Sequence, residues 1–289
     1  MKIGFIGLGI MGESMCENIV KKHNDKVYCS DINRAQVEKL ASLGAVACEN
    51  NIEVAQKADI VISMVPTSDN VKQVYSEILP YITEGMICID MSTIDPSVSV
   101  EVSEWVKAKG AQFADAPVVK SKAAAIDGTL GVLAGCDKEL FPVIEPILSY
   151  MGSTVIYMGG NGKGLVMKIC QNTLVGEIQN GVNETLLMAL HYGISIDNFA
   201  AAVAAGGANC AYMAAQKEKL KNEDYSVAFS FQNMNKDIHI CERMAAEAQM
   251  EMPGMQNVKR IYEKGMAAGL AKEDFRATYK VVRGDCDKE

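Results

Sequence analysis

The sequence has few of the side chains that build metal sites. Its three histidines, His23, His191 and His239, are far apart, and none of its nine cysteines forms a CxxC pair. Metal-binding chains usually supply such ligands at short, regular spacings, so we expect no metal centre. The cysteines are scattered and odd in number. This pattern is typical of reduced thiols that pack as small hydrophobic side chains in a reducing compartment.

Long apolar runs and an excess of positive charge are also absent. No stretch reaches the roughly 18 uninterrupted apolar residues of a membrane span. The first apolar stretch is broken by Gly7, Gly9 and Gly12 and is followed by Glu13, unlike a secretory signal. The net charge of −8 provides no general attraction for nucleic acid or an anionic membrane. We therefore expect a cytoplasmic protein that binds neither nucleic acid nor membrane.

What the first half does contain is an alternation of short β-rich runs with helical stretches. The strand candidates share a high apolar content and lie at residues 3–7, 26–31, 45–48, 59–66, 86–92, 112–118, 129–135 and 154–159. Helix-like spacing with few breakers occurs between the first of them, at residues 12–22, 33–42 and 69–79. Strands that are apolar on both faces and alternate with helices predict a parallel sheet covered by helices, an α/β fold.

The second half has a different character. After GGNGKG at residues 159–164, one helical stretch runs over residues 165–192. Further helical stretches are predicted at residues 196–205, 209–221, 231–249, 254–268 and 272–282. We therefore predict an α/β domain over residues 1–161, followed by an all-helical domain over residues 162–289 that binds substrate and forms dimer contacts.

Three glycines follow the first strand in the spacing Gly-x-Gly-x-x-Gly. Gly7 would permit a tight turn, Gly9 a close approach to a pyrophosphate, and Gly12 close packing of helix and strand. Asp31 lies 19 residues after Gly12, where a carboxylate can accept hydrogen bonds from both ribose hydroxyls. This predicts a Rossmann-type site that favours NAD, because Asp31 would repel the 2′-phosphate of NADP. Arg34 weakens that preference, and a glycine-rich loop without a ligand is the alternative.

Four further stretches make a family resemblance specific. They are MVPTSDNV (64–71), IDMSTIDP (89–96), FADAPVVKSKAAAIDGTLGVLAG (113–135) and GNGKGLVMKICQN (160–172). Together with GFIGLGIMG they resemble the β-hydroxyacid dehydrogenases, the group of 3-hydroxyisobutyrate dehydrogenase and tartronate semialdehyde reductase. The similarity runs nearly end to end and includes FQNMNKDI (231–238). It implies an NAD-dependent oxidoreductase that interconverts a small anionic 3-hydroxy acid and its semialdehyde.

The resemblance assigns the proton transfer to Lys168, as general acid or base for the substrate oxygen. Asn172, four residues later, would share a helix face with it and hold the lysine or the substrate oxygen. The family usually has two asparagines here, whereas this chain has Gln171 before Asn172. Taken alone, Lys168 could lie on a solvated helix face, but its mostly apolar neighbours argue against that interpretation.

The resemblance also implies contacts with the cofactor. In and after the glycine motif they are Gly7, Leu8, Gly9, Ile10, Met11, Gly12 and Asp31. At the ends of two later strands they are Met64, Val65, Pro66, Ser92 and Thr93. Lys236 would approach the nicotinamide from the helical half, with Asp237 as its companion. As isolated residues these would instead indicate packing, a helix N-cap and a surface ion pair.

One departure from the family pattern concerns the substrate. Most members have Ser-Gly-Gly after Asp-Ala-Pro-Val and bind the substrate carboxylate there, whereas this chain has Val119, Lys120 and Ser121. Lys120 would bring a full positive charge to the substrate. Sulfolactaldehyde reductases also place a basic residue here, so a sulfonate-bearing three-carbon aldehyde is an alternative substrate. Otherwise Lys120 faces solvent and Ser121 alone contacts substrate; Asn209 is a further candidate contact.

Other function classes fit the sequence less well. A non-catalytic dinucleotide-binding scaffold would not need Lys168 and Asn172. The decarboxylating phosphogluconate branch shares the first half but has a longer helical part. Apolar faces on several helices of the second half predict a homodimer or homotetramer. The exact substrate and the physiological direction do not follow from the sequence.

Overall fold

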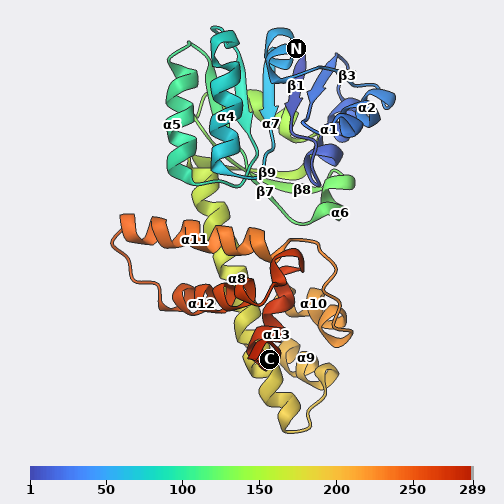
Figure 1. Cartoon of the computed structure of the whole chain (residues 1–289), viewed down its shortest axis with the longest axis vertical. Coiled ribbons are helices and arrows are strands. Elements are labelled where there is room, and N and C mark those ends of the chain that lie inside the picture. The colour runs from blue at the N-terminus through green and yellow to red at the C-terminus, as the bar shows by residue number, and fades with distance from the viewer. Residues whose placement is uncertain (288–289) are drawn as a thin grey trace. The chain divides into compact units, whose positions relative to one another are not determined.

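The computed structural model describes residues 1–287 and divides the chain into two compact units (Figure 1). The first unit comprises Met1–Lys168, and the second begins at Ile169. The division lies inside one long helix, α8 (Lys163–His191). The domain boundary between residues 161 and 162 stays a prediction. Among the described residues, no helix is both long enough and apolar enough to cross a bilayer.

The first unit is built on one nine-stranded sheet. Its strands are β1 (Ile3–Ile6), β2 (Val27–Ser30), β3 (Val46–Ala47), β4 (Ile60–Ser63), β5 (Ile87–Asp90), β6 (Gln112–Asp115), β7 (Val118–Val119), β8 (Leu130–Cys136) and β9 (Gly152–Gly159). Strands β1 to β6 lie in the order β3-β2-β1-β4-β5-β6 and are all parallel. This confirms the predicted parallel sheet. The strand order reverses between β1 and β4, the point where open α/β sheets bind ligands.

The far edge of the sheet is not parallel. Strand β8 runs antiparallel to both β6 and β7, while β9 pairs with β8 in parallel. A parallel crossover needs about a dozen residues or more, usually with a full helix. The segment between Val119 and Leu130 is shorter and carries only the short helix α6 (Lys122–Ile126). The chain therefore returns beside β7 in the opposite direction.

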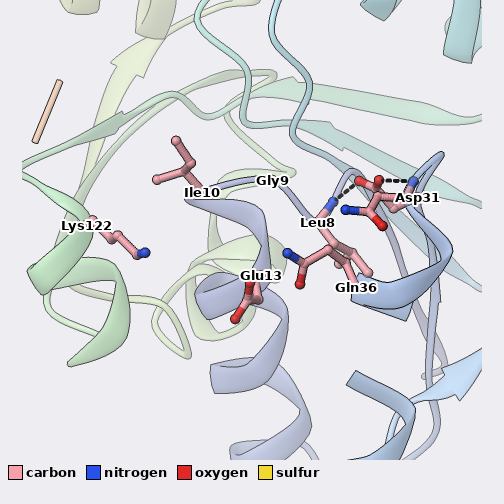
Figure 2. A pocket seen from close by; sticks show the side chains of 8 residues that line it. Leu8, Gly9, Ile10, Glu13, Asp31, Gln36 and Lys122 are labelled. Carbon is pink, nitrogen blue, oxygen red and sulfur yellow. Dashed lines mark hydrogen bonds between the residues drawn. The ribbon is translucent and has the colours of Figure 1, made fainter. Parts of the chain in front are cut away.

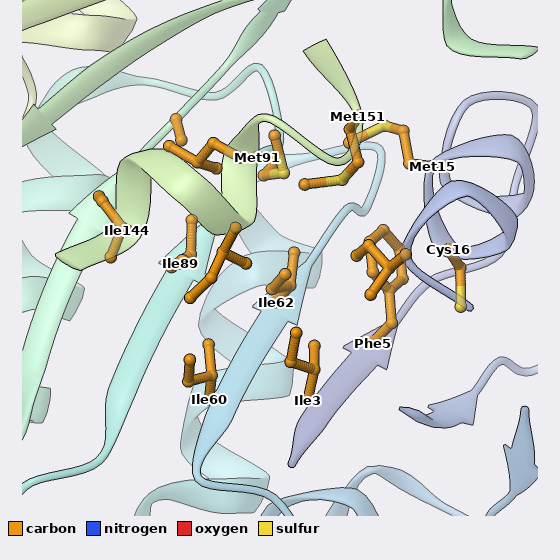
Figure 3. Packing of buried hydrophobic residues seen from close by; sticks show 14 of the residues in the cluster. Ile3, Phe5, Met15, Cys16, Ile60, Ile62, Ile89, Met91, Ile144 and Met151 are labelled. Carbon is orange, nitrogen blue, oxygen red and sulfur yellow. The ribbon is translucent and has the colours of Figure 1, made fainter. Parts of the chain in front are cut away.

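Helices cover both faces of the sheet, as predicted, because its strands are apolar on both sides. One face carries α1 (Gly12–Lys22), α2 (Arg34–Ser42), α6 and α7 (Phe141–Leu148), and the other carries α3 (Asn51–Lys57), α4 (Ser68–Ile78) and α5 (Pro96–Lys107). Along β1, Ile3 and Phe5 belong to the first core and Ile6 to the second. Figure 3 shows Ile3 beside Ile60 and Phe5 on the side of Met15, in the layer that also holds Ile144 of α7.

The second unit is helical, which confirms the fold class predicted for this half. After α8 come α9 (Ile196–Ala205), α10 (Ala211–Lys221), α11 (Phe231–Glu247), α12 (Pro253–Ala267) and α13 (Thr278–Arg283). Short 3-10 turns within residues 1–287 are η1 (Leu79–Tyr81) in the first unit and η2 (Leu270–Lys272), η3 (Phe275–Ala277) and η4 (Asp285–Asp287) in the second. Its core includes Phe231, Met234 and Ile238 of α11 and Val258 and Tyr262 of α12.

The helical stretch predicted over residues 272–282 is confirmed at its end, where α13 covers Thr278–Arg283, but it is not one continuous helix. The segment is divided between η2, η3 and α13, with Asp274 in an extended conformation before η3. The fully buried carboxylate of Asp274 accepts the backbone N–H of Ala228 at 2.9 Å and pairs with Arg276. These tertiary bonds hold Asp274 outside a helix, and local residue spacing does not reveal them.

Candidate functional site

The glycine motif forms the loop between β1 and α1. At Gly7 φ is +95°, and an added Cβ would lie 2.3 Å from the carbonyl oxygen of Met64. An added Cβ at Gly12 would lie 2.0 Å from the carbonyl oxygen of Gly7. At Gly9 no described atom outside the residue and its two chain neighbours comes within 4 Å of such a Cβ. The loop is thus tightly packed at Gly7 and Gly12 and open at Gly9. The predicted contact Met11, just before α1, is half-buried against the core.

Asp31, directly after β2, ties the end of that strand to the glycine loop. Its Oδ2 accepts the backbone N–H of Leu8 at 2.5 Å, and its Oδ1 accepts that of Asn33 at 2.6 Å (Figure 2). A carboxylate oxygen has two acceptor positions, so both oxygens can still accept a hydroxyl. The two bonds therefore orient the Asp31 carboxylate beside the loop without using up its acceptor capacity.

A cavity of about 280 Å³ opens beside this loop (Figure 2). It is lined by Leu8, Gly9, Ile10, Glu13, Asp31, Asn33, Gln36 and Lys122. Four of these residues were not among the predicted cofactor contacts. Glu13 and Gln36 lie in the first turns of the helices after β1 and β2, so their nearness to the motif could have suggested them. Lys122 is distant in sequence, and no local signal points to it.

The loops after β4 and β5 are joined through Asp90 and Ser92. The Ser92 hydroxyl donates to Asp90 Oδ1 at 2.7 Å and accepts the backbone N–H of Val65 at 2.9 Å. The Ser63 hydroxyl donates to the same Asp90 oxygen at 2.8 Å. Burial raises the pKa of Asp90 to about 6. The predicted contacts Val65 and Ser92 therefore meet at the carboxyl ends of two adjacent parallel strands, the edge where ligands bind in such sheets.

The other predicted contacts from these strand ends lie in the same two loops. Met64 and Thr93 are half-buried and Pro66 is exposed. The N-cap of α5 is Asp95, whose side chain accepts the backbone N–H of Ser97 at 3.1 Å. The Ser-Thr pair is therefore not the helix cap that its composition alone would indicate.

Asp115, at the end of β6, holds the start of the helix that carries Lys168. Its Oδ1 accepts the backbone N–H of Gly162 at 2.5 Å, and its Oδ2 accepts that of Leu165 at 2.9 Å. These N–H groups at the beginning of α8 have no partner within the helix. Burial raises the pKa of Asp115 to about 7, although the two hydrogen bonds act in the opposite direction. Lys168, three residues after Leu165, is half-buried.

In the second unit, Asp237 of α11 joins two of the predicted residues. The amide nitrogen of Asn172 donates to Asp237 Oδ2 at 2.7 Å, and Lys236 Nζ lies 3.2 Å from Asp237 Oδ1. The Asp237 side chain is 1% exposed and that of Lys236 is 28% exposed. The expected pairing of Lys236 with Asp237 is confirmed. The bond to Asn172 was missed, because the two residues are distant in sequence.

The geometry of the first unit fits a dinucleotide. The open backbone at Gly9 and the N-terminus of α1 suit a pyrophosphate, and the Asp31 carboxylate suits ribose hydroxyls. No group of three or more histidine, cysteine or carboxylate side chains suited to a metal gathers within the described residues.

Two family models match the chain, one for each half. Residues 2–159 match the NAD binding domain of 6-phosphogluconate dehydrogenase. Residues 162–282 match the NAD-binding domain described for NADP-dependent 3-hydroxyisobutyrate dehydrogenase. The chain belongs to the β-hydroxyacid dehydrogenase family.

Similar proteins share nearly the whole length of this β-hydroxyacid dehydrogenase. The 2-(hydroxymethyl)glutarate dehydrogenase of Eubacterium barkeri is 31% identical, over 97% of this chain and 94% of its own. Glyoxylate/succinic semialdehyde reductase 1 of Arabidopsis thaliana is 30% identical, over 98% of this chain and 99% of its own. The structure of 3-hydroxyisobutyrate dehydrogenase from Mycobacterium tuberculosis with L-serine has a TM-score of 0.92 at 27% identity, covering 98% and 99% of the two chains.

These similarities confirm the predicted activity at the level of the family. The chain is an oxidoreductase that binds NAD(P) and acts as a hydroxyacid dehydrogenase or semialdehyde reductase. It is therefore an enzyme and not a non-catalytic scaffold.

In this β-hydroxyacid dehydrogenase, the segment that departs from the family pattern lies between β7 and α6. Lys120 is exposed and has φ of +81°, a conformation that favours glycine. Its Nζ donates to the carbonyl oxygen of Thr129 at 2.6 Å. Ser121 is half-buried and directly precedes α6. The lysine thus occupies a backbone conformation that glycine adopts more readily.

Asn209 lies in the second unit and lines another cavity, of about 310 Å³. This cavity lies between α9 and α10, where Cys210, Met213 and Lys217 also line it. Asn209 itself is exposed. The side chains around it do not include Asn172 or Lys236.

Proposed function

We propose that the enzyme interconverts a small anionic 3-hydroxy acid and its semialdehyde, with Lys168 transferring the proton of the substrate oxygen. The placement of Lys168 carries this proposal: it is half-buried on a helix whose first turn is held by the buried Asp115. A side chain on an element fixed in this way keeps the position that proton transfer requires. When bound, the nicotinamide cofactor supplies or takes up the hydride.

Lys168 would serve both directions of the reaction. As an ammonium group it donates a proton to the carbonyl oxygen of the semialdehyde, and as a neutral amine it accepts the proton of the alcohol. Asn172 would contact the substrate oxygen, and its bond to Asp237 fixes the plane of its amide. The same carboxylate holds the amine of Lys236, the proposed nicotinamide contact of the second unit.

NAD is the proposed cofactor, in preference to NADP. Gly9 and the start of α1 would hold the pyrophosphate, and Asp31 would accept the ribose hydroxyls and repel a 2′-phosphate. Arg34 is the nearby cation that could offset this repulsion. Its Nη1 donates to the carbonyl oxygen of Cys48 at 2.8 Å, which supports the preference for NAD.

Lys120 and Ser121 are the proposed contacts of the anionic end of the substrate, with Asn209 as a third. The Lys120 ammonium group has three donors, of which one is engaged by Thr129. Its full charge supports a second candidate, a sulfolactaldehyde reductase acting on a sulfonate-bearing three-carbon aldehyde.

Apolar side chains on α8 support self-association. Leu174 is 55% exposed, Met188 60% and Leu190 40%. Scattered exposed apolar residues are common, but several on one helix favour an interface. We propose a homodimer or homotetramer in the cytoplasm.

A substrate panel tests the proposed reaction. Oxidation of NADH and NADPH is measured with C3 to C5 semialdehydes and with sulfolactaldehyde. We expect turnover with at least one of them, and faster with NADH. Lys168→Ala is expected to lower kcat by about 10²- to 10⁴-fold while NADH affinity is retained. Lys163→Ala, which removes an exposed lysine from the same helix, is the matched control and should keep full activity.

The outcomes separate the parts of the proposal. Full activity of Lys168→Ala, or an equal loss in Lys163→Ala, would contradict the role of Lys168. Faster turnover with NADPH would contradict the role of Asp31. No preference for sulfolactaldehyde over tartronate or succinic semialdehyde would reject the sulfonate candidate and leave the carboxylate one.

A further inference from the structure

A lysine from outside the glycine motif lies on the wall of the cofactor cavity. Lys122 is the first residue of α6 and lines the cavity together with Leu8, Gly9 and Ile10. Figure 2 shows its side chain extending from α6 toward the part of the cavity formed by Ile10 and Glu13. We propose that the Lys122 ammonium group pairs with the pyrophosphate of bound NAD(P).

The charges around the cavity favour this role. The other charged residues that line it are Glu13 and Asp31, both acidic. Glu13 is paired with Lys39, and Asp31 accepts two backbone amides. Lys122 forms no ion pair or hydrogen bond with any residue that the structure describes. Its charge is therefore available to a ligand.

A bound pyrophosphate is negatively charged, and apart from Lys122 no described residue lining the cavity carries a full positive charge. The glycine loop and the start of α1 offer backbone N–H groups and a partial positive charge only. Asp31 repels an incoming phosphate, the charge of Glu13 is offset by Lys39, and the protein as a whole carries a net charge of −8. A lysine on the facing wall supplies a full unit of opposite charge.

Tertiary contacts fix α6 beside the helix that begins at the glycine loop. The buried side chain of Asn18, on α1, donates from Nδ2 to the carbonyl oxygens of Ala125 at 2.8 Å and Ile126 at 3.2 Å. At Gly128, where φ is +65°, an added Cβ would lie 2.8 Å from Asn18 Oδ1. Because α6 is held to α1 in this way, Lys122 keeps its place on the cavity wall.

The position of Lys122 favours contact with the pyrophosphate and not with the 2′-phosphate of NADP. Figure 2 shows Lys122 and Asp31 on opposite sides of Ile10. Asp31 marks the adenosine ribose, where the 2′-phosphate of NADP would be attached. Lys122 therefore faces the part of the dinucleotide that NAD and NADP share. This inference concerns cofactor binding alone and holds whichever substrate the panel identifies.

Binding of cofactor fragments without substrate tests the inference. Lys122→Met is expected to raise the Kd of NADH, of NADPH and of ADP-ribose about fivefold, and the difference from the wild type should shrink as salt is added. Adenosine, which has no phosphate, should bind the wild type and Lys122→Met with equal Kd. Lys122→Arg keeps the charge and should restore most of the affinity. Lys138→Met, which removes an exposed lysine elsewhere in the first unit, is the matched control and should bind like the wild type.

Four results would overturn the assignment. One is an unchanged Kd for NADH in Lys122→Met, and another is an equal loss in Lys138→Met. A loss confined to NADPH would place the charge at the 2′-phosphate. An equal loss for adenosine and ADP-ribose would indicate a distorted cavity instead of a missing phosphate contact.

Discussion

Two buried aspartates support the proposed site at the scale of single residues. Asp90 accepts its hydrogen bonds from Ser63 and Ser92, and Asp115 accepts the backbone N–H groups that begin α8. No lysine, arginine or histidine among the described residues forms an ion pair with either carboxylate. Burial without a cation raises the pKa of Asp90 to about 6 and that of Asp115 to about 7. Both groups thus bind protons more readily in the folded chain.

These pKa values predict that the free energy of unfolding falls as the pH rises through about 6 and 7. An unfolded aspartate has a pKa of about 3.9, so the folded protein binds more protons in this range, and raising the pH favours the unfolded chain. Urea unfolding from about pH 5 to about pH 8 measures the trend. Asp115→Asn should flatten it, whereas Asp69→Asn, at an exposed site, should not. A wild-type stability that rises over this interval would contradict the assignment.

At the scale of elements, two glycines of the same motif, Gly9 and Gly12, have different roles in the loop between β1 and α1. Gly12 is enclosed by the backbone of Gly7, so it is needed for the packing of α1 on β1. Gly9 has open space around it, so it is needed for the approach of a ligand. One position supports the fold and the other supports binding.

Alanine at these two positions should therefore change different properties, stability at Gly12 and cofactor binding at Gly9. Gly12→Ala places a Cβ against a backbone carbonyl and should lower the free energy of unfolding by roughly 1–3 kcal/mol. Gly9→Ala should leave that free energy within about 0.5 kcal/mol of wild type while weakening NADH binding severalfold. Denaturant unfolding and NADH titration of both variants measure the difference. Wild-type stability of Gly12→Ala would contradict the packing argument.

At the scale of the whole molecule, the chain forms two units with separate apolar cores. The first buries both faces of its sheet, whereas the second gathers its core chiefly along α11 and α12. Leu174, Met188 and Leu190 lie outside that core and remain exposed on α8. Burying them against another copy of the chain would remove apolar surface from water.

Light scattering coupled to size exclusion tests the proposed self-association. We expect the mass of a homodimer or homotetramer, because apolar residues exposed on one helix favour an interface between copies. Met188→Glu should shift the mass toward a monomer, since a charge at an apolar contact is unfavourable. Leu43→Glu, at an exposed apolar site of the first unit, is the matched control. A monomeric wild-type protein would reject the proposal.

Sequence periodicity predicted most helices and strands because it reflects which faces are buried, and burial of one face is a local property. The predicted span of α1, residues 12–22, matches the observed helix. The prediction over residues 272–282 was wrong where the buried carboxylate of Asp274 binds distant backbone. The antiparallel return of β8 was also outside the reach of local spacing.

By itself, the sequence determined the order of elements, the glycine loop with Asp31, and a family whose motifs recur in order along the chain. Only the tertiary structure decided that Asp115 holds the start of α8, that Asn172 bonds to Asp237, and that Lys122 lines the cofactor cavity. The physical reason is that local spacing encodes which face of an element is buried. The neighbours of a polar side chain instead depend on how distant elements pack, and so on the order of the strands and the placement of the helices.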